Sequence, residues 1–405
     1  MLFKIFSAII LTYFSVYSLA ESPVEQDPEK RHDYQTPTKR LEIKEYPQFA
    51  DDLDFENIEL AITRQIRRYN QKNLSGYVEM GGERIPQTQF RETLIHFLNV
   101  AKEYQNCLSK NLKQNEICKQ RLNETIAKDF DVYAPELKKG DSGFGEDRFA
   151  WFTAYYTPTL LGQYTKSDEF AWGIYSKPED RKLARSTREE IDFDGALENQ
   201  GYDLFYSPDL FELYLLQVEG GGRVVINNED GSQSSYYLSY EGTNGRTWNF
   251  ISKYMREKGY INDGSVYSQR KFLEENPDKW REIYSTCPSY VYFKVTETPP
   301  LGNDSVPLTD NRSIATDRNY YRFKGLLSFV QTKRLKPDSR EYDLPKPSPE
   351  AYMEFSRFML DQDTGGAIRG KARVDLYFGE DEYAERAAQL VNNDGRLYFL
   401  VKKMD

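Results

Sequence analysis

The sequence predicts a mainly β protein that carries helices near its N-terminus. From about residue 149 onwards, short runs of aromatic and β-branched residues alternate with Gly, Asn and Asp, a texture typical of strands and turns. Before that point, apolar residues recur at helical spacing over 57–69 and again over 94–101. The 405 residues are enough for two or three domains.

The first twenty residues have the pattern of a secretory signal peptide. Lys4 precedes an apolar run, and small residues stand at Ser18 and Ala20, where a signal peptidase would cut. The run is shorter than the roughly 20 residues that span a bilayer. No Cys lies near the cut, so we expect no lipid anchor there. The stretch 21–50 is polar and contains several Pro, which predicts a mobile linker.

The later elements are predicted in chain order from their residue patterns. Asn228 and Gly231 frame a hairpin turn between two strand-like runs. Residues 351–360 fit a helix or a strand equally, because single-sequence patterns do not separate the two here. Strands are predicted over 149–158, 212–218, 223–227, 289–295, 326–331, 373–379 and 395–403, and helices over 247–258 and 268–275.

The composition excludes several kinds of chemistry. His32 lies in a polar leader and His96 in a helical-looking stretch, so a Ser-His-Asp triad or a two-His metal site has almost no raw material. Three scattered Cys cannot make a CxxC zinc site, and we predict no metal and no cofactor. A formal charge of −10 argues against nucleic-acid binding. The 31 Tyr, 24 Phe and many carboxylates suit carbohydrate chemistry. Cys107 and Cys118 could form a disulfide, or all three Cys could be unpaired.

Asp375 is the carboxylate that stands out. It lies in an apolar strand-like run between Val374 and Leu376, so alternation puts it on the face opposite these two neighbours. If that face lines a cleft, partial burial raises the pKa of the carboxyl, as a general acid for a glycosidic oxygen requires. The alternative is a surface Asp on an edge strand. A calcium loop starting at Asp361 is disfavoured, because its twelfth position is Ala372.

Six short sequence segments, taken together and in their order along the chain, resemble the membrane-bound lytic murein transglycosylase A family. Together they run from about 149 to 403, and the last two resemble that family's C-terminal domain named for three aspartates. The segments are FTAYYTP (152–158), LLQVEGGGRV (215–224), YEGTNGRTW (240–248), CPSYVYFK (287–294), PLTDNRSIATDR (307–318) and DTGGAIRG with VDLYFG (363–370 and 374–379).

The resemblance implies a fold of two β domains with a groove between them. The larger is a double-psi β-barrel, and the smaller β-barrel domain is inserted into it. We therefore divide the chain into a signal peptide at 1–20, a polar linker at 21–50, and N-terminal helices with the first part of the double-psi barrel at 51–158. The inserted domain takes 159–295, and the C-terminal part of the barrel takes 296–405. On this reading 351–360 is a strand.

The resemblance also implies the reaction. The family cleaves peptidoglycan between N-acetylmuramic acid and N-acetylglucosamine without water, leaving a 1,6-anhydro end. The family's single catalytic Asp corresponds to Asp375, with Asp363 and Asp317 in support. Residues expected to bind the glycan are Tyr155, Thr157, Gln217, Glu219, Gly220 and Tyr240.

The expected partners are glycan strands, no nucleic acid and a wall-remodelling complex, for a monomer located in the periplasm or at the outer membrane. The chain departs from the family at Glu219 and Gly221, where Gln and Ser are usual, so contacts to the glycan are expected to differ there. The alternatives are a peptidoglycan hydrolase and a non-catalytic wall-binding protein.

Overall fold

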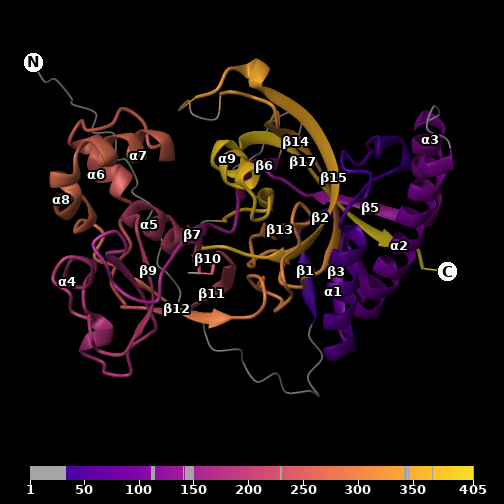
Figure 1. The fold of residues 1–405 in the computed structure, drawn as a ribbon. Coiled ribbons are helices and arrows are strands. Elements are labelled where there is room, and N and C mark those ends of the chain that lie inside the picture. The colour runs from indigo at the N-terminus through magenta and orange to yellow at the C-terminus, as the bar shows by residue number, and fades with distance from the viewer. Residues whose placement is uncertain are drawn as a thin grey trace, which may run out of the picture.

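The computed structural model describes residues 33–110, 115–139, 141, 150–228, 230–341, 344, 346–366 and 368–404. The predicted signal peptide lies outside these residues. Figure 1 shows two parts side by side, one built from β7 to β12 with α4 to α8, and the other from the remaining strands with α1, α2, α3 and α9. The described elements of the second part lie before β7 and after β12 in the sequence, so the first part is an insertion.

Six strands of the larger domain close into a barrel. Their order is β14-β15-β13-β16-β6-β17, and β14 also pairs with β17, which closes the ring. The pairs β13–β15 and β16–β6 are parallel, and the other four are antiparallel. The strands are β6 (Ala150–Tyr155), β13 (Ser313–Thr316), β14 (Leu326–Leu335), β15 (Tyr352–Asp363), β16 (Arg373–Tyr377) and β17 (Asn392–Lys402). The predicted mainly β fold is confirmed.

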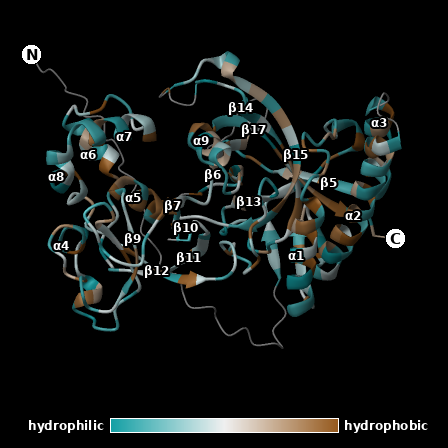
Figure 2. Cartoon of the chain, viewed as in Figure 1, coloured by the Kyte–Doolittle hydropathy of each residue, from teal (hydrophilic) through white to brown (hydrophobic). Residues whose placement is uncertain are grey.

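The two predicted N-terminal helices form, and a third follows them. They are α1 (Ile58–Gln71), α2 (Gln87–Lys110) and α3 (Asn115–Asp129), and β5 (Phe130–Pro135) follows α3. Ile58, Ala61 and Ile62 form the buried stripe of α1. Figure 2 shows brown and teal residues on the same helices, as expected of amphipathic helices with one buried face.

The prediction of a mobile linker is wrong for 33–50. Here β1 (Tyr34–Thr36) pairs with β3 (Tyr77–Met80), which pairs with β4 (Glu83–Pro86), and β2 (Thr38–Arg40) pairs with β5. The short helix η1 (Ile43–Glu45) follows. Backbone pairing to neighbouring strands orders this polar segment, and composition does not reveal such pairing.

The inserted domain contains two sheets and five helices. In the larger sheet the order is β12-β11-β10-β7, and the smaller one pairs β8 with β9. The strands are β7 (Thr159–Leu161), β8 (Trp172–Tyr175), β9 (Asp203–Ser207), β10 (Gly221–Asn227), β11 (Gln233–Thr243) and β12 (Val291–Thr296). The helices are α4 (Arg188–Asp192), α5 (Leu210–Glu219), α6 (Ile251–Glu257), α7 (Val266–Glu275) and α8 (Trp280–Tyr284), with the short turns η2 (Leu183–Arg185) and η3 (Pro277–Lys279).

The predicted strand over 212–218 is instead helix α5. Asp209 caps its N-terminus by accepting hydrogen bonds from the backbone N–H groups of Phe211 and Glu212, at 2.7 and 3.0 Å. Seven of its ten residues are buried, so the helix is apolar on nearly every side. Such a helix has no polar face, and its short apolar run cannot be told from a strand by periodicity.

The ambiguous segment 351–360 belongs to β15, preceded by η4 (Pro349–Ala351), and pairs with β14 along its whole length. Helix α9 (Glu382–Leu390) was not predicted, although Asp381 caps it by accepting from the backbone N–H of Ala384 at 2.6 Å. Among the described residues, no helix is long and apolar enough to span a membrane.

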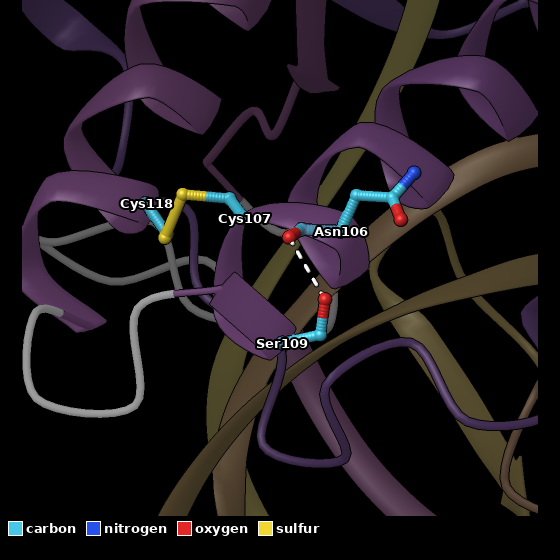
Figure 3. The surroundings of a disulfide bond; sticks show 4 residues. All are labelled: Asn106, Cys107, Ser109 and Cys118. Carbon is cyan, nitrogen blue, oxygen red and sulfur yellow. Dashed lines mark hydrogen bonds between the residues drawn. A yellow bond between two sulfur atoms is a disulfide. The ribbon is translucent and has the colours of Figure 1, made fainter.

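Cys107 and Cys118 form the disulfide that the sequence left open, and Figure 3 shows it joining α2 to α3. Their Cα atoms lie 5.7 Å apart. Cys287 is unpaired and buried in the inserted domain. The disulfide therefore fixes the helical part of the larger domain.

Candidate active site

A cavity of about 340 Å³ lies between the barrel and the inserted domain. Residues of both domains line it, so it is the groove that the resemblance implied. The barrel domain contributes Tyr155, Tyr156, Thr157, Leu308, Asp363 and Tyr377, and the inserted domain contributes Glu219, Gly220, Gly221, Leu238, Ser239, Tyr240 and Lys294.

Alternation along β16 separates a core face from a site face. Val374 and Leu376 are fully buried in the barrel core, while Asp375 between them is half-buried on the opposite face. In the parallel pairing of β16 with β6, Asp375 lies opposite Thr153. Because β16 is paired on both sides, with β13 and β6, Asp375 is not on an edge strand.

Asp375 has two polar neighbours that act on its charge. The Thr153 hydroxyl donates a hydrogen bond to Asp375 Oδ1, and Arg373 Nη2 donates to Thr153 Oγ1 at 2.6 Å. Burial raises the pKa of Asp375, the Thr153 hydrogen bond and the Arg373 charge oppose that rise, and the charge of Asp363 adds to it. The net pKa is above the ordinary value for Asp.

Asp363 stands at the end of β15, where it lines the cavity. Its Oδ2 accepts from the Tyr155 hydroxyl at 2.9 Å, and its Oδ1 accepts from the backbone N–H of Asn303 at 2.9 Å. Burial raises the pKa of Asp363, although both hydrogen bonds favour the charged form. The carboxyl is therefore held on both oxygens at the edge of the groove.

Asp317 is more deeply buried than the other two aspartates. It is 1% exposed, and of the three aspartates only Asp363 lines the cavity. Its carboxylate accepts from the backbone N–H groups of Asn319 and Gly370, at 2.9 and 2.8 Å. It therefore ties the chain after β13 to the turn that leads into β16, which places Asp375 indirectly.

Glu219 and Gly220 end helix α5 at the groove. Gly220 has φ of 78°, a left-handed conformation that glycine adopts without strain, and this turns the chain into β10. The Glu219 side chain is exposed to the groove that it lines, and the groove walls partly desolvate its carboxyl. This burial, with the charge of Asp375, raises the pKa of Glu219 to about 8. Two carboxyl groups, one from each domain, thus interact at this site.

The remaining predicted residues divide into two groups. Thr157 and Tyr240 line the cavity, where the Thr157 hydroxyl pairs with the Tyr377 hydroxyl at 2.7 Å and Tyr240 is 45% exposed. Gln217 does not line it, so the prediction of a glycan contact is corrected for this residue. Its side chain is buried and its Oε1 accepts from Arg188 Nη2 at 2.5 Å, because that side of α5 faces the core of the inserted domain.

Sequence reasoning missed four residues that shape the site: Thr153, Asn303, Arg373 and Tyr377. Arg373 and Tyr377 are two residues from Asp375 on the same strand, so alternation alone could have found them. Thr153 is 222 residues from Asp375 and meets it only through strand pairing. No group of three or more His, Cys, Asp or Glu in the described part of the chain is arranged to hold a metal ion.

Comparisons with known proteins match both domains. Residues 151–294 match the family model of the MltA specific insert domain, and residues 312–401 match that of the 3D domain. The membrane-bound lytic murein transglycosylase A of Escherichia coli K12 is 32% identical over 256 residues, which is 62% of this chain and 65% of that protein. The match therefore spans less than two thirds of that relative. The Vibrio cholerae protein of the same name is 27% identical over 71% of this chain and 73% of its own.

Solved structures share the fold. The structure of E. coli MltA with bound chitohexaose has a TM-score of 0.62 at 24% identity, covering 91% of this chain and 95% of that one. The lytic transglycosylase LtgG of Burkholderia pseudomallei has a TM-score of 0.59 at 21% identity, covering 91% of this chain and 96% of its own. The chain thus contains the MltA specific insert domain and the 3D domain, and it shares its fold with solved MltA structures.

Proposed function

We propose that this protein is a lytic transglycosylase of peptidoglycan. It cleaves the β-1,4 bond between N-acetylmuramic acid and N-acetylglucosamine without water and leaves a 1,6-anhydromuramic acid end. The observation that carries the proposal is the placement of Asp375 in this family's fold. It is a half-buried carboxyl with a raised pKa, two residues along β16 from Tyr377, which lines the groove between the two domains.

In the proposed reaction Asp375 acts twice. Its carboxyl first donates a proton to the oxygen of the leaving N-acetylglucosamine as the bond to C1 breaks. The resulting carboxylate then takes the proton of the C6 hydroxyl, whose oxygen attacks C1 of the same muramic acid. Because the nucleophile belongs to the substrate, no water-activating residue is needed. The proton returns to Asp375, which restores the starting state.

The groove has the chemistry to hold a glycan. Tyr240 offers an exposed ring from the inserted domain, and Asp363 and Glu219 offer carboxyl oxygens for sugar hydroxyl and amide groups. Support for a glycan ligand also comes from the E. coli relative, whose structure contains chitohexaose. We assign Asp363, Tyr155, Thr157, Glu219, Gly220 and Tyr240 to substrate binding, and Asp317 to support of the loop that leads to Asp375.

We also propose that the protein acts outside the cytoplasm after residues 1–20 are removed, as a monomer that can join a wall-remodelling complex. The curated relatives are named membrane-bound, and a disulfide between Cys107 and Cys118 suits an oxidising compartment. The domain division remains 51–158 with 296–405 for the barrel domain and 159–295 for the insert.

Glu219 gives a reason to keep one alternative, a peptidoglycan hydrolase. A hydrolase needs a second carboxyl near the scissile bond, and Glu219 is one that interacts electrostatically with Asp375. The two reactions leave different ends on the glycan: a reducing muramic acid from hydrolysis, and an anhydro end from the transglycosylase.

The test is mass spectrometry of muropeptides released from purified peptidoglycan by the wild type, Asp375→Asn and Asp278→Asn. Asp278 is exposed on η3, which makes it a matched control. We expect anhydro ends from the wild type and the control, and a loss of at least about 1000-fold for Asp375→Asn. Reducing ends would support the hydrolase, and full activity of Asp375→Asn would exclude Asp375 as the catalyst. No release by the wild type would favour a non-catalytic wall-binding protein.

A further inference from the structure

We propose that Thr153 and Arg373 are positioning residues that fix which oxygen of Asp375 carries the transferred proton. This rests on the proposed function, because it assigns the proton of that reaction to one atom. Arg373 lies outside the six sequence segments that resemble the family. The inference comes from the contacts between β6 and β16.

Strand register brings the three side chains together. In the parallel pairing of β16 with β6, Arg373 lies opposite Trp151 and Asp375 lies opposite Thr153. These four positions share one face of the sheet because each strand contributes residues two apart. The neighbouring positions Phe152 and Val374 are fully buried on the core face. The arrangement is thus set by backbone pairing and not by mobile loops.

The hydrogen bonds run from Arg373 through Thr153 to Asp375. A guanidinium can donate but cannot accept, so the 2.6 Å contact makes Thr153 Oγ1 the acceptor from Arg373 Nη2. The single hydroxyl proton of Thr153 is then free to point to Asp375 Oδ1. Because Oδ1 accepts this proton, a protonated Asp375 carries its own proton on Oδ2. The structure therefore assigns Oδ2 as the acid, and later the base, of the proposed reaction.

Arg373 is itself held from the other side. Its Nη1 donates to the backbone carbonyl of Val374 at 2.6 Å, and its guanidinium carbon lies 4.7 Å from the centre of the Trp151 ring. The Trp151 indole N–H donates to Asn392 Oδ1 at 2.7 Å, which fixes that ring. A long side chain with these contacts loses little further freedom when it orients Thr153.

The same two residues oppose the effect of burial on Asp375. Burial raises the pKa of its carboxyl, whereas the Thr153 hydrogen bond and the positive charge of Arg373 favour the charged form. The charge of Asp363 at the end of β15 adds to the rise, and the charge of Asp375 in turn raises the pKa of Glu219 at the end of α5. Because both residues favour the charged carboxylate, removing either one should raise the pKa of Asp375 further.

The experiment compares full-length Thr153→Val, Thr153→Ser and Arg373→Gln with the wild type. The control Arg396→Gln changes an exposed Arg on β17. Initial rates of anhydromuropeptide release are measured against pH, and the Asp375 carboxyl is titrated by carbon-13 NMR. We expect kcat of Thr153→Val to fall on the order of 10- to 100-fold with KM nearly unchanged. We also expect its alkaline limb and the Asp375 titration to move to higher pH. Thr153→Ser keeps the hydroxyl and should restore both.

Arg373→Gln should likewise shift the titration of Asp375 upward, and Arg396→Gln should leave rate and titration unchanged. The proposal is overturned if Thr153→Val keeps the wild-type titration, or if Thr153→Ser loses as much activity as Thr153→Val. If Thr153→Val does not fold, Thr153→Ser and Arg373→Gln decide the outcome by the same measurements. If the wild type releases no anhydro ends, the proposed function fails, while the NMR titration still tests the contacts on their own.

Discussion

The Tyr155 hydroxyl donates a hydrogen bond of 2.9 Å to Asp363 Oδ2 across 208 residues of sequence. Tyr155 ends β6 and Asp363 ends β15, so the contact joins two barrel strands at the wall of the groove. The negative charge of Asp363, after the larger effect of burial, raises the pKa of Tyr155 well above its usual range. Tyr155 thus keeps its hydroxyl proton and remains a donor to Asp363 at neutral pH.

Tyr155→Phe removes this donor without changing the packing of the ring. A hydrogen bond to a charged group contributes about 1.5–3 kcal/mol, so we expect kcat/KM for muropeptide release to fall on the order of 10- to 100-fold. The pKa of Asp363 should rise, because a hydrogen bond that favours its charged form is lost. The control is Tyr164→Phe, whose hydroxyl pairs with that of Tyr236 away from the cavity. Equal losses in the two variants would contradict a role for the Tyr155–Asp363 contact.

Glu219→Gln tests the raised pKa of Glu219. This pKa is about 8 in the folded protein, against an ordinary value of 4.5. As pH rises from 4.5 to 8, the unfolded chain loses the proton first, so wild-type stability falls over this window. Glu219→Gln lacks this pH-dependent loss of stability. The difference in unfolding midpoint between the variant and the wild type should therefore grow from pH 5 to 8 and then stay constant. A constant difference between pH 5 and 9, measured by chemical denaturation, would argue against the shift.

Asp51 and Arg312 form a buried ion pair that joins the chain before α1 to the barrel. Arg312 Nη1 and Nη2 donate to the two carboxylate oxygens at 2.7 and 2.9 Å, and neither side chain is exposed. Breaking such a pair leaves a buried charge without a partner, so Asp51→Asn should lower the free energy of unfolding by about 3–5 kcal/mol. Asp33→Asn is the control, because its pair with Arg84 is exposed and should contribute about 1 kcal/mol or less.

The same pair predicts a loss of stability in acid. Burial alone would raise the pKa of Asp51, but the Arg312 charge and the hydrogen bonds to Asp51 outweigh it and lower the pKa below 3.8. The pair's contribution is thus complete above pH 3.8 and is lost as pH falls through the lower, folded value. Acid denaturation of the wild type should be steeper in this range than that of Asp51→Asn, and parallel curves would contradict the assignment.

The disulfide should stabilise the fold without affecting the groove. Cys107 and Cys118 are 11 residues apart, so closing this loop contributes about 3 kcal/mol. The double variant Cys107→Ser/Cys118→Ser should unfold at lower denaturant, and reductant should no longer change its midpoint. Its rate of muropeptide release under native conditions should match the wild type, since both residues lie on α2 and α3 and not at the cavity. A rate loss in the folded variant would show that the helices influence the site.

Local patterns determined a large part of this protein. Periodicity placed α1 and α2, and β-rich runs placed β6, β10, β12, β14, β16 and β17, because each has one clear buried face or a paired apolar run. Alternation around Asp375 correctly separated it from its buried neighbours. The same reasoning failed for α5, which is buried on nearly every side, and for β1 and β2, which depend on backbone pairing.

Tertiary structure alone decided which of these residues act together. Sequence supplied Asp375 and Asp363 as candidates, but only parallel pairing of β6 with β16 set Thr153 beside Asp375, and only packing turned Gln217 into the core. Burial and, after it, the charge of Asp375 in the other domain raise the pKa of Glu219. Hydrogen bonds and charge effects act over a few ångströms in space, whereas sequence patterns report each residue's own strand or helix, so contacts between distant segments appear only once the chain has folded.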